Sequence, residues 1–158
     1  MTAKTAAVLS LGYVNGFYSN GASTGGFLGS TYAKLEVTIQ LTQLSRAVIG
    51  VQHSFANAVI SNFSYNESAY VSYVQQIVGR LGLDLSGRYQ YIQYEGTFVD
   101  QGQSGRVDNF FQLGASLDYF MRNWAYVGVG YSLLDNSSNK AIDDYLKQQV
   151  FVRLGITY

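Results

Sequence analysis

The chain has 158 residues, of which 47% are hydrophobic and 13% charged, and its formal net charge at pH 7 is zero. The absence of cysteine excludes disulfides and thiolate metal sites, and the lack of a basic excess argues against nucleic-acid binding. Soluble domains usually contain about 25% charged residues, and a membrane helix needs roughly 18 consecutive apolar residues, which this sequence lacks. Low charge combined with 14 tyrosines and 17 glycines is typical of a transmembrane β-barrel.

Eight segments alternate between apolar and polar residues with a period of two, which predicts eight β-strands that each have one apolar face. The predicted strands are 5–14, 26–42, 46–55, 68–78, 81–94, 109–121, 124–133 and 149–158. The second segment alternates most clearly. The fourth is ambiguous, because apolar residues fall on both of its faces.

The predicted connections alternate between short turns and long polar loops. The short connections are 43–45, 79–80 and 122–123, and the long ones are 15–25, 56–67, 95–108 and 134–144. Short turns at one rim and long loops at the other are typical of outer-membrane barrels. The pattern therefore predicts a single domain over 1–158, an eight-stranded antiparallel up-and-down barrel in which the last strand pairs with the first.

The distribution of charge distinguishes a membrane barrel from a soluble one such as a lipocalin, which turns its apolar face inward. The charged residues of the predicted strands fall on the polar face, and they are Lys34, Glu36, Arg46, Asp84, Arg88, Asp118, Lys147 and Arg153. That face also mixes glycines with aromatic residues, a combination that suits a narrow lumen filled by side chains. We therefore expect these residues to form a polar network inside the barrel.

Aromatic residues lie near both ends of the predicted apolar faces. Those expected at the short-turn rim are Tyr119, Trp124 and Tyr158, and those expected toward the loop rim are Tyr13, Tyr89, Tyr91 and Tyr131. Two aromatic girdles that flank an aliphatic band match the two lipid–water interfaces of a bilayer. The sequence thus predicts a transmembrane barrel whose outer partner is lipid or detergent.

The last strand ends in alternating apolar residues and an aromatic terminus: Val152, Leu154, Ile156 and Tyr158. This ending resembles the signal read by the outer-membrane insertion machinery. The chain as a whole resembles the small eight-stranded outer-membrane barrels, of which the OmpA membrane domain and OmpX are examples. The resemblance implies a monomer in the bacterial outer membrane, although residues 1–5 lack the apolar core of the secretory signal that this location requires.

Residues 131–151 are also similar to the C-terminal part of β-barrel porins of type 2, so the alternative is an eight-strand portion of a wider porin or export barrel. The charges of the polar face can form a plug of ion pairs or line an ion path. We expect an integral outer-membrane barrel with a filled lumen and a structural or surface-interacting role. A narrow pore is the alternative to this role.

An enzymatic role receives little support from the sequence. His53, the only histidine, falls on the apolar face, and some small barrels that modify lipid A place a serine two residues after such a histidine. Here Phe55 takes that position, Ser54 points to the opposite face, and the spacing does not place Glu67 near His53. The sequence therefore predicts no catalytic residue, no metal site and no cofactor.

Overall fold

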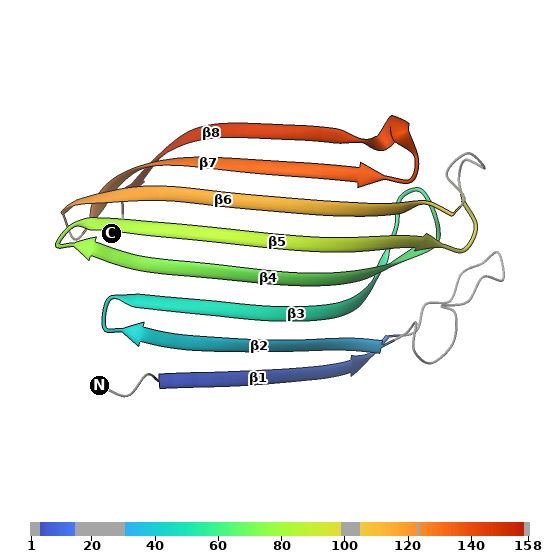
Figure 1. Ribbon diagram of the computed structural model, residues 1–158, viewed down its shortest axis with the longest axis horizontal. Coiled ribbons are helices and arrows are strands. Elements are labelled where there is room, and N and C mark those ends of the chain that lie inside the picture. The colour runs from blue at the N-terminus through green and yellow to red at the C-terminus, as the bar shows by residue number, and fades with distance from the viewer. Residues whose placement is uncertain (1–3, 15–30, 99–104, 123, 157–158) are drawn as a thin grey trace.

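The fold is that of a computed structural model, which describes residues 4–14, 31–98, 105–122 and 124–156. Eight antiparallel strands form one sheet in which each strand pairs with the next along the chain (Figure 1). The strands are β1 (Lys4–Tyr13), β2 (Thr31–Thr42), β3 (Ser45–Asn57), β4 (Phe63–Val78), β5 (Leu81–Glu95), β6 (Val107–Arg122), β7 (Ala125–Ser138) and β8 (Tyr145–Ile156). A short 3₁₀ turn, η3 (Ala141–Asp143), precedes β8.

The prediction of eight antiparallel up-and-down strands is confirmed, and the strand ends differ from it mainly at the loop rim. Strands β3, β4 and β7 continue into the polar segments that were predicted to be loops, and β8 begins at Tyr145. Backbone hydrogen bonds extend a ladder whatever the side chains, so alternation of polarity underestimates strand length there. The predicted start of the second strand, 26–30, lies outside the described residues.

The register keeps the apolar residues of all eight strands on one face. One cross-strand row contains Leu9, Leu35, Val51, Ala69, Tyr89 and Phe111. In β4, the ambiguous segment, Val71 pairs with Ile49 and therefore shares the apolar face, whereas Tyr70 pairs with Gly50 on the polar face. The sheet thus has one apolar and one polar side along its whole width.

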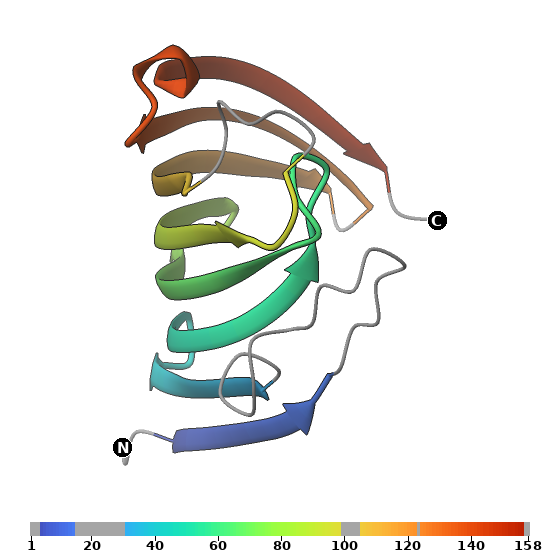
Figure 2. The ribbon, with the colours of Figure 1, turned by 90° about the vertical axis from the view of Figure 1, so that its right-hand side faces the viewer.

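The predicted closure of the barrel is not observed, because no pairing joins β8 to β1 among the described residues. The two strands lie at opposite ends of a curved sheet (Figure 2). Each of the seven observed pairings joins strands that follow one another in the chain, so a hairpin connection favours it locally. A β1–β8 pairing has no such connection and depends on the curvature of the whole sheet.

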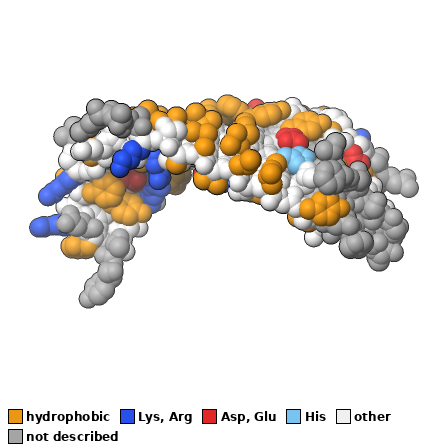
Figure 3. Space-filling model, turned by 90° about the horizontal axis from the view of Figure 1, so that it is seen from below, with side chains coloured by type: hydrophobic (Ala, Val, Ile, Leu, Met, Phe, Trp, Pro, Cys, Tyr) orange, Lys and Arg blue, Asp and Glu red, His pale blue; other side chains and the backbone are white. Residues whose placement is uncertain are grey.

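The described part of the sheet buries almost no hydrophobic side chain. Only Phe63 and Ala125 are buried hydrophobic residues, and the apolar face is open to its surroundings. Figure 3 shows hydrophobic side chains gathered along the outer side of the arch. Covering apolar surface stabilises a protein by about 25 cal/mol per Å². The described strands therefore leave most of their apolar face uncovered.

Aromatic rings on the polar face lie directly over glycines of the neighbouring strand. Tyr70 covers Gly50, Phe151 covers Gly130, and a Cβ at either glycine would collide with the ring. Tyr126 lies over Gly155 in the same way. The glycines are therefore required for close approach rather than for backbone freedom.

Gly50→Ala is expected to lower the free energy of unfolding by about 1–3 kcal/mol, because the new methyl group displaces the Tyr70 ring. Gly87→Ala is the matched control, since its Cβ would lie at an ordinary 3.5 Å from Leu113 and Val71. Denaturant unfolding followed by circular dichroism measures both. In a Tyr70→Ala background the cost of Gly50→Ala is expected to vanish, and a cost that persists there would contradict the steric explanation.

Candidate functional site

The polar face carries a first cluster of side chains that joins β2, β4 and β5. Glu36 accepts a hydrogen bond of 2.6 Å from the Tyr70 hydroxyl and forms an ion pair of 3.0 Å with Lys34. Lys34 Nζ and the Arg88 guanidinium lie 5.9 and 5.7 Å from the centre of the Tyr70 ring. Cations near the face of an aromatic ring are attracted to it, so Tyr70 organises both ends of the cluster.

A second cluster joins β6 to β8 across β7. Arg153 donates two hydrogen bonds to Asp118, from Nε to Oδ1 at 3.0 Å and from Nη2 to Oδ2 at 2.7 Å. Its Nη2 also donates to Ser116 Oγ at 2.6 Å. Asp118, Gly128 and Arg153 occupy one cross-strand row, and the missing side chain at Gly128 lets Arg153 reach over β7. Paired charges of this kind are tolerated away from water.

The remaining residues of the predicted polar network do not join these clusters. Arg46 and Asp84 line a hollow of about 600 Å³ at the turn end of the polar face, and no ion pair joins them among the described residues. Arg80, Arg122 and Asp118 line the same hollow. Figure 3 shows basic side chains beneath one end of the arch. Lys147 lies exposed on β8.

The structure brings together two residues that the sequence did not connect. His53 and Glu67 are directly opposite each other on β3 and β4, and His53 Nδ1 lies 2.5 Å from Glu67 Oε1. They adjoin a largely apolar hollow of about 370 Å³ that includes Leu9, Leu35 and Val51. Continuous pairing of β3 with β4 places the two residues opposite each other. The sequence predicted a long loop over 56–67 instead, so this pairing could not be deduced from it.

The His53–Glu67 pair lies where the apolar face changes character. The adjacent cross-strand row, nearer the turns, has an aliphatic residue on each of β1 to β4. The row of His53 instead continues through Glu67 and Tyr91 to Asn109. His53 Nε2 is buried without a hydrogen-bond partner among the described residues. Phe55 rather than a hydroxyl follows His53 on this face, so the pair lacks a neighbouring nucleophile along β3.

The predicted interface aromatics are described with one exception. Tyr13, Tyr89, Tyr119, Trp124 and Tyr131 are exposed, Tyr91 is half-buried, and Tyr158 lies outside the described residues. The other residues of the predicted insertion signal are exposed along the apolar side of β8, and they are Val152, Leu154 and Ile156.

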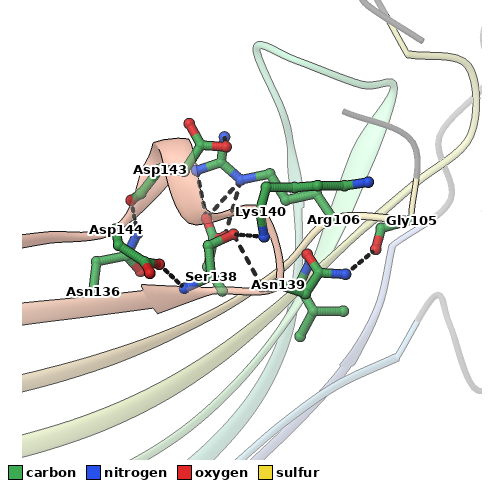
Figure 4. A network of polar contacts seen from close by, with 10 residues as sticks. Gly105, Arg106, Asn136, Ser138, Asn139, Lys140, Asp143 and Asp144 are labelled. Carbon is green, nitrogen blue, oxygen red and sulfur yellow. Dashed lines mark hydrogen bonds and ion pairs between the residues drawn. The ribbon is translucent and has the colours of Figure 1, made fainter. Parts of the chain in front are cut away.

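An ion network around the buried Asp108 joins the loop end of β6, β7 and β8 (Figure 4). Arg106 donates to both carboxylate oxygens of Asp108 and lies 2.9 Å from Asp143 Oδ2. Asp108 is 0% exposed, and the buried Asn136 of β7 donates to the backbone oxygen of Asp143. The hydrogen bond to Asp108 raises the pKa of Arg106 above its ordinary value despite burial. Arg106 therefore stays charged and neutralises the buried carboxylate.

Among the described residues, no group of three or more histidine, aspartate or glutamate side chains is placed to hold a metal ion. The same residues include no helix that is long and apolar enough to cross a membrane. No protein-family model matches the chain, and neither a curated protein nor a solved structure matches it.

Proposed function

We propose that the chain is the wall of an integral outer-membrane β-barrel with a non-enzymatic structural or surface-interacting role. The observation that carries this proposal is the exposed apolar face of the turn-side half of the sheet, which runs in register across the strands. Toward the loops the same side also carries Glu67 and Asp135. Lipid hydrocarbon covers such a face at no cost, whereas water does not. In the described sheet the two edges leave backbone groups unpaired, and closing them would satisfy the requirement that a bilayer imposes on backbone polar groups.

Strand length and the polarity of the apolar side also support a membrane-spanning wall. A transmembrane strand needs about 9–11 residues. The shortest strand, β1, has 10 residues and the longest strands have 16. The aliphatic part of the face ends at exposed aromatic residues, with Tyr119 and Trp124 toward the turns and Tyr89 toward the loops. Aromatic residues of this kind favour the lipid–water interfaces.

The test is to refold the protein in detergent and in lipid vesicles. We expect β-type circular dichroism, flotation with the vesicles, and a gel mobility in SDS that changes after boiling. A stable monomer in detergent-free buffer that does not associate with vesicles would contradict the proposal. The exposed end of β8 then has a function as well, because Val152, Leu154 and Ile156 are available to the insertion machinery that the resemblance implies.

A pore is the second candidate, and the hollow near Arg46, Arg80 and Arg122 is the observation that favours it. The two ion-paired clusters instead support a filled interior, because they occupy the polar face with side chains that bind one another. We therefore expect no steady nanosiemens-scale conductance in planar bilayers. Steady openings whose ion selectivity changes in Arg153→Ala would contradict the filled interior and support the pore.

A further inference from the structure

Among the described residues, the edge strands β1 and β8 each lack a neighbouring strand on one side. Among the apolar residues of the strands, exposure is greatest there, at 73% for Leu11 and 77% for Leu154, against 41% for Leu85 in the middle of the sheet. Natural edges are usually shielded by proline, by inward-pointing charge or by bulges. β1 has no charged residue after Lys4, and the chain has no proline. β8 carries Lys147 and Arg153, and Arg153 is already paired with Asp118 on β6. Both edges are therefore suited to pair with another strand.

The register of the open sheet determines how these two edges meet if it closes. The cross-strand row that starts at Leu9 passes through Leu35, Val51, Ala69, Tyr89, Phe111 and Asp135 and ends at Leu146. The stagger of a barrel is the number of residues by which such a row is displaced when it returns to the first strand. Closing eight strands at a tilt of 35–45° requires a stagger of about 8–12 residues. The residue of β8 that faces Leu9 must lie on the C-terminal side of Leu146, because only one residue of β8 precedes Leu146.

We propose that β8 closes on β1 of the same chain with a stagger of eight residues, which places Leu154 opposite Leu9. This inference rests on the proposed membrane barrel. An even stagger keeps the apolar faces in phase, since side chains alternate with a period of two. Among the even values in the range, eight retains the longest ladder, because each larger stagger moves β8 past the end of β1. It pairs Leu11 with Val152 and Tyr13 with Val150.

The polar face independently favours this register. With Leu9 opposite Leu154, Gly12 faces Phe151, Ser10 faces Arg153 and Val8 faces Gly155. Large side chains of one strand thus meet small residues of the other along the proposed β1–β8 pairing, which we call the seam. The same arrangement occurs within the sheet, where directly opposite partners are Gly50 and Tyr70, Gly130 and Phe151, and Gly155 and Tyr126. A stagger of ten would instead place Phe151 opposite Val14 and Gly155 opposite Ser10, so neither residue would meet a partner of complementary size.

Cysteine cross-linking tests the seam without background, because the natural chain has no cysteine. The double variant Leu9→Cys/Leu154→Cys, folded in vesicles and oxidised, is expected to form a disulfide within one chain, seen by mass spectrometry of the joined peptides. Ser10→Cys/Leu154→Cys places the cysteines on opposite faces. Leu9→Cys/Leu146→Cys joins residues of one row across the open sheet. Both controls are expected to stay reduced.

A mixture of the two single variants separates the possible partners of the edges. Cross-linked dimers from Leu9→Cys mixed with Leu154→Cys would overturn closure within one chain and indicate a wider barrel made of several copies. Absence of any cross-link in protein that floats with vesicles would also overturn the seam. Failure to float would overturn the membrane proposal itself, and cross-linking of the soluble protein would still show whether the edges pair.

Discussion

Arg106→Leu is expected to lower the free energy of unfolding by about 3–5 kcal/mol, which is the usual cost of leaving a buried charge without its partner. Asp108 is 0% exposed and receives three hydrogen bonds from the Arg106 guanidinium, and Asp143 loses its ion pair as well. The network fastens the start of β6 to the turn that precedes β8, so its loss is expected to loosen the loop end of three strands.

Lys140→Leu is the matched control, because it removes one positive charge from the same loop end and no ion pair involves Lys140 among the described residues. Denaturant unfolding in detergent, followed by circular dichroism, compares the two variants. The double variant Arg106→Leu/Asp108→Leu is expected to recover most of the loss. Equal stability of Arg106→Leu and Lys140→Leu would show that the ion network does not hold this end of the sheet.

If the apolar face contacts lipid as proposed, Val71→Arg is expected to destabilise the inserted protein by about 2–4 kcal/mol, the cost of a basic residue facing lipid near the bilayer midplane. Val71 is exposed on the apolar face and pairs with Ile49 on β3 and Gly87 on β5. In a soluble protein the same substitution at an exposed position would have almost no effect, because an exposed arginine is well hydrated.

Ser72→Arg, on the polar face of the same strand, provides the comparison for Val71→Arg. In the proposed barrel its charge would face the interior, and it is expected to cost less than Val71→Arg. Equilibrium unfolding from lipid vesicles measures the difference between the two variants. If Ser72→Arg proves the more destabilising substitution, the assignment of the two faces is reversed and the apolar side is not the lipid side.

The fold could be predicted from the sequence where side-chain polarity alternates and hairpins are tight. The segment around Ile49 fixes β3 because its apolar residues recur at every second position, and a short turn then fixes its register against β2. The ambiguous segment around Val71 could not be assigned alone, since Tyr70 and Val74 are also apolar. Its pairing with β3 places Val71 on the apolar face and Tyr70 on the polar face. Such a pairing cannot be deduced from the pattern of one strand alone.

The contacts at the loop rim could not be predicted, for a physical reason. His53–Glu67 and Arg106–Asp143 depend on how far strands continue through polar residues, where backbone pairing rather than side-chain polarity sets the length. The pairing of Lys34 with Glu36 is local, since two residues along a strand return to the same face. Asp118 and Arg153 meet only because Gly128 between them has no side chain, which requires the register of three strands.

The most direct test of the membrane wall is a spin-label scan of six consecutive positions, 127–132 on β7, with the protein folded in lipid vesicles. The described register places Val127, Val129 and Tyr131 on the apolar side and Gly128, Gly130 and Ser132 on the polar side. We expect collisions with oxygen, which concentrates in lipid, to peak at every odd-numbered position, with little access for a water-soluble nickel reagent there. Equal access of the nickel reagent to odd and even positions would show that the apolar face contacts water and would contradict the proposed function.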